Sequence, residues 1–224
     1  MNGLKPFDIF VIGGGINGTA IAADAAGRGL RVGLCETHDL GEAAFSRCGK
    51  AFHGGIRHLE RLKLYTLRKT LKERNILLKR APYLINAIPF IIPCNEQSKP
   101  RWMLQSRLAL YDLLGNKYLR PYISHRSLPK KPLECLNPSA GKWLSYPECE
   151  IDDSRLVISN ALCAAENQAK ILPRTRCHSA EPIEHGWRIV LEDIVTKERQ
   201  QVESKTIVNA TGAQEIGRAS CRER

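Results

Sequence analysis

The stretch FDIFVIGGGINGTAIAADAAGRG, residues 7–29, decides which fold the rest of the sequence must join. Its first six residues, Phe7–Ile12, are apolar and partly β-branched, which predicts a buried strand of a parallel sheet. Gly13, Gly15 and Gly18 then form a G-x-G-x-x-G pattern ahead of an alanine-rich segment, which predicts a helix. A strand, a glycine turn and a helix in this order are typical of a dinucleotide-binding α/β domain.

Each glycine of this pattern has its own task. The first permits a tight turn, the second lets a pyrophosphate approach the backbone, and the third lets helix and strand pack closely. The helix N-terminus would offer the pyrophosphate free N–H groups and a partial positive charge, and we include Asn17 in this binding set. The next apolar run, RVGLCE, ends in Glu36, whose carboxylate can accept hydrogen bonds from ribose hydroxyls and repels a 2′-phosphate. The dinucleotide is therefore NAD or FAD, and this motif alone does not decide between them.

Length and composition limit the classes of function. The chain has 224 residues, 43% of them hydrophobic and 25% charged, as in a soluble globular protein that buries a core. Its formal charge of +11 suits anionic partners, but few residues are aromatic, which argues against nucleic acid. Eight cysteines without a C-x-x-C pair, and no secretory leader, indicate reduced thiols and no metal site. The apolar run AIPFIIPC is too short to cross a bilayer.

Two neighbouring segments concentrate positive charge. In KAFHGGIRHLE, residues 50–60, four basic side chains surround a pair of glycines, which is typical of an anion site: Lys50, His53, Arg57 and His58. Residues 59–80 predict a long helix with an apolar stripe, formed by Leu64, Leu67, Leu71 and Leu78. A neighbouring face carries cations, namely Arg61, Arg68, Lys72 and Lys79. This helix is either an ordinary solvated helix or a basic surface for anionic lipid headgroups.

The remaining sequence predicts a discontinuous domain with an insertion. Residues 84–150 contain a proline-edged strand, a helix that stops near Gly115 and an irregular segment to about Pro147, and we interpret them as an inserted substrate-facing region. A helix that Asp152 or Asp153 caps follows, and then three strands: ILPRTR, GWRIVLED and QQVESKTIVNATG. We assign 1–83 and 151–213 to a Rossmann-like nucleotide domain.

The last strand ends in NATG, residues 209–212, which would return the chain to the nucleotide, where Gly212 admits the cofactor closely. This ending is similar to the second fingerprint of two-dinucleotide-binding-type flavoproteins and favours FAD. Together with the opening motif, the segments KAFHGGIRHLE, EIDDSRLVISNA and IVNATG resemble the FAD-dependent glycerol-3-phosphate dehydrogenases that pass electrons to quinone. The resemblance runs from about residue 7 to residue 213.

This resemblance implies oxidation of sn-glycerol 3-phosphate to dihydroxyacetone phosphate at the cytoplasmic face of a membrane. It implies that Ser46, Lys50 and His53 lie on the flavin loop and that Arg57 faces the substrate phosphate, which a guanidinium can grip bidentately. His53 is our candidate for the base that accepts the hydroxyl proton, with a structural or flavin-packing role as the alternative. His58 completes the candidate catalytic set.

The chain departs from this family at several positions. Ala44 and Phe45 precede Ser46 where the family has Thr-Ser, His58 replaces a tyrosine, and Ala213 replaces a proline. Two other functions therefore stay open: a related FAD-dependent amine or amino-acid oxidase, and a non-catalytic dinucleotide-binding fragment. Substrate competition would separate the dehydrogenase from the oxidase, since glycerol 3-phosphate should bleach the flavin of the dehydrogenase and amino acids should not.

The last residues, IGRASCRER at 216–224, do not resemble the rest of the chain. They back-translate to ATC GGA AGA GCG TCG TGT AGG GAA AGA, a common sequencing-adapter sequence. We therefore expect a non-native tail that begins after a reading frame cut near Gln214, and an N-terminal fragment of a longer protein. Strands that lack their partners would expose apolar surface, so we expect this fragment to be inactive and prone to aggregation.

Overall fold

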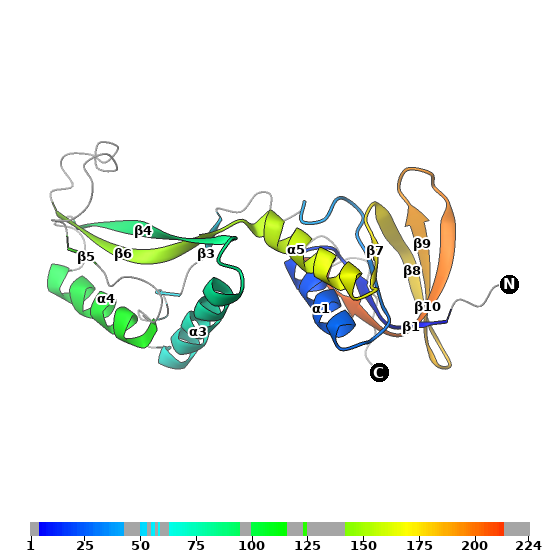
Figure 1. The fold of residues 1–224 in the computed structure, drawn as a ribbon, viewed down its shortest axis with the longest axis horizontal. Helices are drawn as coiled ribbons and strands as arrows, with labels where there is room; N and C mark the ends of the chain where they lie inside the picture. The colour runs from blue at the N-terminus through cyan, green and yellow to red at the C-terminus, as the bar shows by residue number, and fades with distance from the viewer. Residues whose placement is uncertain are drawn as a thin grey trace. The chain divides into compact units, whose positions relative to one another are not determined.

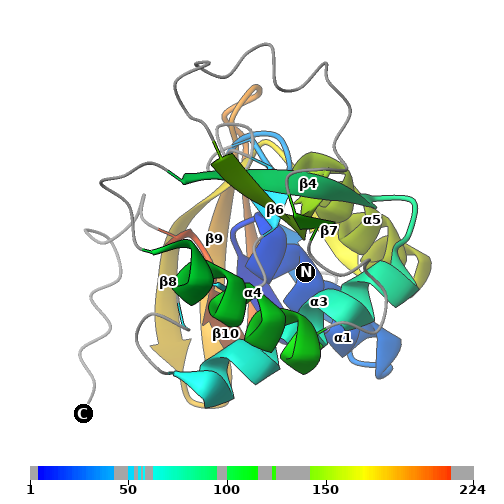
Figure 2. The same cartoon turned by 90° about the vertical axis from the view of Figure 1, so that its left-hand side faces the viewer.

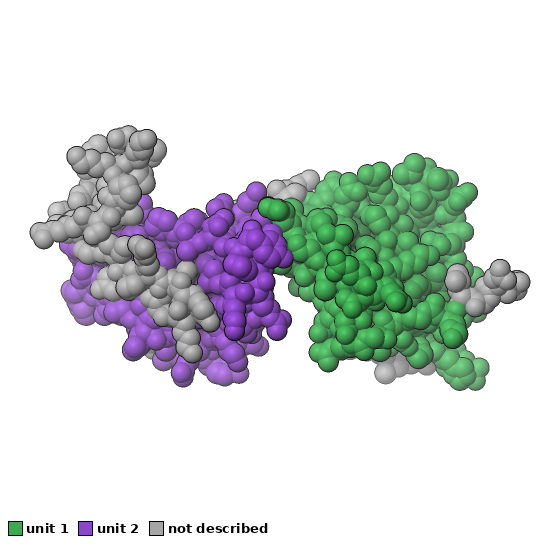
Figure 3. Space-filling model, viewed as in Figure 1, with its two compact units in different colours: residues 1–49, 153–224 green, residues 50–152 purple. Residues whose placement is uncertain are grey.

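A computed structural model describes most of the chain, and the residues divide into two compact units. One unit comprises residues 1–49 and 153–224 and the other residues 50–152 (Figure 3). The described residues are 5–42, 50–52, 55–56, 58, 63–94, 100–115, 123–124 and 142–212.

The first unit contains a six-stranded sheet in the order β7-β2-β1-β10-β9-β8 (Figure 1). Four neighbouring strands are parallel, namely β7 (Lys170–Leu172), β2 (Val32–Cys35), β1 (Phe7–Ile12) and β10 (Arg199–Asn209). The last two pair antiparallel, β9 (Gly186–Asp193) with β10 and β8 (Thr175–Ile183) with β9. The parallel strands and the helices between them confirm the predicted α/β class.

Apolar side chains on both faces explain why β1 lies at the centre of this sheet. Val11 packs under the helices α1 (Ile16–Gly27) and α5 (Asp153–Glu166), which lie side by side on one face. Phe10, on the other face, packs with Ile189 and Leu191 of β9. Phe10 and Val11 are both fully buried, as the apolar run predicted.

The second unit is a smaller antiparallel sheet with helices on one face (Figure 2). Its long strands are β4 (Ile85–Cys94) and β6 (Lys142–Ile151), and the short strands β3 (Ala51–Phe52) and β5 (Ile123–Ser124) pair with β6. The helices are α3 (Leu64–Arg80) and α4 (Arg101–Gly115). They meet the sheet in one core of Leu67, Leu71, Leu108, Tyr111, Leu144 and Tyr146.

Two features of this unit differ from the sequence analysis. The segment expected to be irregular up to Pro147 contains β6 from Lys142 onward, and Pro147 lies opposite Pro89 of β4. The helix assigned to the nucleotide domain, α3, packs against α4 and belongs to the second unit, so the units divide after residue 49, where the sequence suggested residue 83. Of its predicted apolar stripe, Leu67 and Leu71 are buried, while Leu64 is exposed.

Candidate dinucleotide-binding site

The candidate site lies where the carboxyl ends of three parallel strands of the first unit meet. The central strand β1 lies between β2 and β10 in the sheet. From β1 the chain continues to β2 on one side, and it returns to the other side of β1 with β10, so β1 and β10 form a switch point in the strand order. The Gly13 N–H donates to the carbonyl of Cys35 and the Ala210 N–H donates to that of Ile12, each at 2.8 Å. Such switch points are where open α/β sheets bind ligands.

The glycines of the motif differ in what a side chain would meet. A methyl group on Gly13 would come within 2.6 Å of the Ala210 carbonyl oxygen, and one on Gly18 within 1.9 Å of the Gly13 carbonyl oxygen. Gly13 also has a φ of +113°. At Gly15 a methyl group would meet no described atom within 4 Å, and the φ of −78° suits any residue. Packing therefore explains Gly13 and Gly18, whereas the space beside Gly15 at the helix end holds no atom of the described residues.

The N-terminus of α1 has the properties of an anion site. Gly15 is its N-cap, so no side chain caps the helix, and its first turn contains no acid. The Thr19 hydroxyl donates to the Gly15 carbonyl at 3.0 Å, and no side chain of the described residues caps the N–H groups of the first turn. These N–H groups and the helix dipole favour a phosphate.

Glu36 is fixed beside this turn by two backbone donors. Its Oε2 accepts a hydrogen bond from the Gly14 N–H at 2.6 Å, and its Oε1 accepts one from the His38 N–H at 3.0 Å. Each carboxylate oxygen keeps a further lone pair, so both could also accept from ribose hydroxyls. A methyl group on Gly14 would lie 2.7 Å from Glu36 Cβ and 2.6 Å from Leu40 Cδ2. The sequence analysis did not foresee this role of Gly14, although the unbroken GGG run was a hint.

The end of β10 supplies the third wall. The Asn209 side-chain oxygen accepts from both the N–H and the hydroxyl of Thr211, at 3.2 and 2.7 Å, and so shapes the turn. Gly212 follows with a φ of +69°, which favours glycine. The segment beyond β10 thus lies beside the β1 turn through Ala210 and Thr211, whose backbone atoms would come within 3.0 Å of a methyl group on Gly13, and the cofactor contact of Gly212 stays a prediction.

Of the other predicted site residues, three are described by the structure and three are not. Asn17 is exposed in the first turn of α1, while Lys50 and His58 belong to the second unit. Ser46, His53 and Arg57 lie outside the described residues. In the described part of the chain, no cluster of three or more His, Cys, Asp or Glu side chains could hold a metal ion. The same part contains no helix long and apolar enough to cross a membrane.

Comparison with known proteins places this geometry in a family. The sequence model described as FAD dependent oxidoreductase (DAO) matches residues 8–222. The chain belongs to this FAD-dependent oxidoreductase family. FAD is therefore the dinucleotide expected at the site, and the resemblance drawn from the sequence is confirmed at the level of the family. The uncapped end of α1, the space beside Gly15 and the fixed Glu36 carboxylate fit the pyrophosphate and ribose of FAD.

Several members of the family are close in sequence. Glycerol-3-phosphate dehydrogenase of Pseudomonas aeruginosa is 39% identical over 92% of this chain and 40% of its own length. D-erythritol 1-phosphate dehydrogenase of Brucella abortus is 41% identical over 92% of this chain and 41% of its own length. The solved glycerol-3-phosphate dehydrogenase of Bacillus halodurans, complexed with FAD, aligns with a TM-score of 0.65 at 26% identity over 92% of this chain and 34% of that chain. The chain thus spans about 40% of the curated relatives' length.

Proposed function

We propose that the full-length protein oxidises sn-glycerol 3-phosphate to dihydroxyacetone phosphate with FAD and passes the electrons to quinone. One observation carries the proposal: a chain with a site that fits FAD is 38–39% identical, over 92% of its length, to glycerol-3-phosphate dehydrogenases of Pseudomonas aeruginosa and Escherichia coli. Bound FAD would supply the two-electron acceptor that no amino-acid side chain provides.

In this proposal the first unit holds the cofactor through backbone groups. The N–H groups at the start of α1, around Asn17, bind the pyrophosphate, and Gly15 lets it approach. Glu36 accepts hydrogen bonds from the ribose hydroxyls, and Gly212 admits the cofactor near the end of β10. The sequence resemblance adds Ser46, which lies outside the described residues, and Lys50, which belongs to the second unit, as further proposed cofactor ligands.

The basic segment that includes Lys50 and His58 binds and orients the substrate. Arg57 pairs with the substrate phosphate, because a guanidinium donates two parallel hydrogen bonds to phosphate oxygens. An imidazole nitrogen of His53 takes the proton of the C2 hydroxyl while the C2 hydrogen leaves with its electron pair, so that the carbon becomes a carbonyl. His58 assists in positioning the substrate beside Arg57.

Anaerobic addition of substrate to the purified full-length protein tests this function. Glycerol 3-phosphate should bleach the flavin absorption within the mixing time, while glycine, proline and glycerol without phosphate should leave it unchanged. Bleaching by amino acids and not by the phosphate ester would contradict the proposal and favour the amino-acid oxidase alternative. The solved glycine oxidase and L-proline dehydrogenase that this chain resembles are 18% and 20% identical, which supports a shared fold alone.

A second substrate, D-erythritol 1-phosphate, has a specific observation in its favour. The enzyme named for it in Brucella abortus is 41% identical to this chain, as close as the glycerol-3-phosphate dehydrogenases. Both substrates present a terminal phosphate and a neighbouring secondary hydroxyl, so Arg57 and His53 could serve either. The ratio of kcat/KM for the two esters, measured with an artificial electron acceptor, would assign the substrate.

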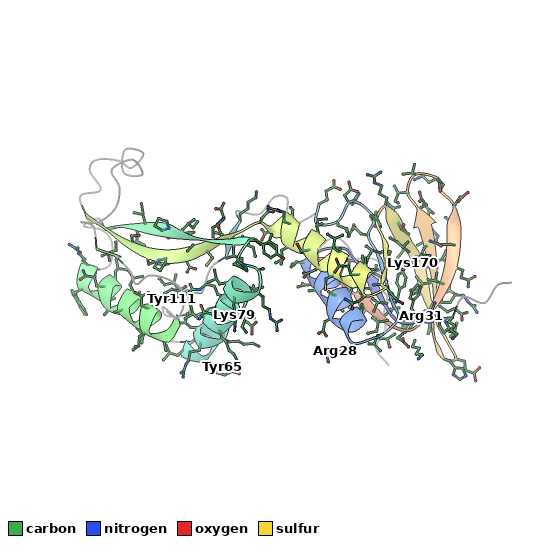
Figure 4. The ribbon with its side chains drawn as sticks, in the orientation of Figure 1. Arg28, Arg31, Tyr65, Lys79, Tyr111 and Lys170 are labelled. Atoms are coloured by element: carbon green, nitrogen blue, oxygen red, sulfur yellow. The ribbon has the colours of Figure 1, made fainter. Side chains whose placement is uncertain are left out.

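We also propose that the protein works at the cytoplasmic face of a membrane, where quinone resides. Cationic side chains are exposed along α3, namely Arg68, Lys69, Lys72, Lys79 and Arg80. Tyr65 of α3 and Trp102 and Leu113 of α4 are exposed by 84%, 70% and 83% (Figure 4 labels Tyr65 and Lys79). Cations near anionic headgroups contribute about 1 kcal/mol each, and aromatic rings favour the interface. Salt-sensitive co-sedimentation with phosphatidylglycerol vesicles is expected, and its loss in a Lys72→Glu/Lys79→Glu variant; no binding by the unaltered protein would contradict this.

A further inference from the structure

A buried charged network in the second unit has no part in the proposed chemistry. Arg74 of α3 and Glu148 of β6 are only 2% and 0% exposed, and Arg74 Nη1 lies 3.3 Å from Glu148 Oε2. The hydroxyl of Tyr111, on α4, donates to Glu148 Oε1 at 2.5 Å and accepts from Arg74 Nη1 at 2.9 Å. Side chains from α3 and α4 therefore both contact the Glu148 carboxylate of β6 (Figure 4 labels Tyr111).

Stability alone is a poor explanation for this network. Removing two charges from water is costly, and apolar residues of similar volume often stabilise such a site as well or better. Arg74 Nε has no hydrogen-bond partner among the described residues, so the network is incompletely satisfied as well. Burial and the neighbouring Glu148 raise the pKa of Tyr111 far above its ordinary value of 10, so its hydroxyl keeps its proton. What the network provides is one fixed arrangement of α3, α4 and β6.

The sheet side of the network leads directly to the basic segment. The two residues after Glu148, Cys149 and Glu150, pair with Phe52 and Ala51 of β3. The Ile151 N–H then donates to the Lys50 carbonyl at 2.9 Å. The backbone of residues 50–52 is thus aligned by the part of β6 that Arg74 and Tyr111 hold.

The helix side of the network leads to the same segment. Thr70 lies one turn before Arg74 on α3, and a methyl group on Gly55 would come within 3.0 Å of the Thr70 hydroxyl oxygen. The same methyl group would lie 2.7 Å from the ring of His58. The backbone N–H of His58 donates to the Gly55 carbonyl at 2.8 Å. Ile56 packs against the core that contains Leu67 and Leu71. The Gly55–His58 turn therefore rests on α3.

We propose that Arg74, Tyr111 and Glu148 are positioning residues that fix the β3 segment and the Gly55–His58 turn relative to each other. The described residues of the basic segment are anchored on β6 from one side and on α3 from the other, and the network ties these two elements together. The consequence for catalysis rests on the proposed function: the segment grips the substrate phosphate only when both anchors are in place. Loss of the network should therefore weaken substrate binding more than it slows turnover.

Two variants of the full-length protein test this proposal. Tyr111→Phe removes one hydroxyl, and Arg74→Met/Glu148→Leu replaces both charges by apolar groups and leaves neither charge unpaired. Tyr83→Phe is the matched control, because it makes the same chemical change at a side chain that is 66% exposed in the same unit. We expect amide hydrogen exchange in the peptide spanning residues 50–58 to accelerate at least tenfold in both variants. Exchange in β1 and α1, and in the control, should not change.

Steady-state kinetics supply a second readout. The KM for glycerol 3-phosphate should rise at least tenfold in both variants, with kcat within about threefold and FAD content unchanged. Wild-type exchange at residues 50–58 in both variants would overturn the proposal, and so would a loss of kcat with unaltered KM. If the unaltered protein oxidises no phosphate ester, the proposed function fails, while the exchange measurement still decides whether the network positions the segment.

Discussion

Replacing Gly15 by alanine separates a glycine that serves a ligand from glycines that serve the fold. The alanine methyl would meet no described atom within 4 Å, and the backbone φ of −78° is ordinary for alanine. Loss of the N-cap glycine destabilises the helix, whereas the lower entropy of the unfolded chain with alanine stabilises the folded state. The two effects on the free energy of unfolding cancel to within about 1 kcal/mol. We therefore expect Gly15→Ala to fold like the unaltered protein.

The effect on the cofactor should be large in the same variant. In the proposed site, a methyl at Gly15 would occupy the side from which the pyrophosphate approaches α1, so at least one hydrogen bond to a charged oxygen would be lost. Such a bond contributes about 1.5–3 kcal/mol, so its loss would raise the Kd for FAD about 10- to 140-fold.

Gly18→Ala is the matched comparison. Its methyl would lie 1.9 Å from the Gly13 carbonyl oxygen, which is backbone and cannot move aside. Overpacking of this kind costs about 3 kcal/mol, and the better helix propensity of alanine returns about 1 kcal/mol. The net loss of about 2 kcal/mol would lower Tm by about 4–8 °C for a domain of roughly 150–250 residues.

Thermal unfolding and flavin fluorescence titration of the cofactor-free full-length variants measure both quantities. Gly15→Ala should keep the Tm and lose FAD affinity, while Gly18→Ala should lose Tm. If Gly15→Ala binds FAD with unaltered affinity, the pyrophosphate does not lie at the start of α1 and the assignment of the site is refuted.

Three further predictions concern single side chains. Glu36→Gln turns an amide NH2 toward one of two backbone N–H donors, so the Kd for FAD should rise about tenfold; an unchanged titration curve would contradict this. Backbone N–H groups of Thr196 and Val195 hold the pKa of Asp193 below its ordinary 3.8, so its carboxylate stabilises the fold above that pH and ceases to do so as the pH falls through the lowered value. The advantage of the unaltered protein over Asp193→Ala in urea unfolding should therefore shrink as the pH falls below about 4, and a constant advantage would oppose this. Burial raises the pKa of the Cys149 thiol, so peptide mapping after brief alkylation should find the exposed Cys163 modified and Cys149 intact; equal labelling would be inconsistent with this core.

The sequence was sufficient where structure depends on neighbours along the chain. Phe7–Ile12, the glycines and the helix up to Gly27 were predicted correctly because strand, turn and helix patterns are local there. The separation of Gly18 and Glu36 along the sequence also predicted that an acidic side chain lies beside the turn. The roles assigned to Arg57 and His53 remain predictions, because both lie outside the described residues.

Long-range pairing limited the rest of the sequence analysis. Pro147 suggested an irregular segment, yet β6 tolerates it opposite Pro89 of β4. Arg74 lies within the segment predicted as a basic helix, and only Glu148, 74 residues later, shows why its side chain is buried. Gly14 looked like a variable position of the motif until Glu36 was found against it. In each case the decisive partner is distant in sequence, and periodicity carries no information about it.

Purification of the full-length protein, followed by its visible absorption spectrum and a count of FAD per polypeptide, tests the central claim most directly. The account predicts a yellow protein with flavin bands and one FAD per chain, released on denaturation as the dinucleotide. A folded, colourless protein that takes up no FAD when the cofactor is added in excess would contradict it.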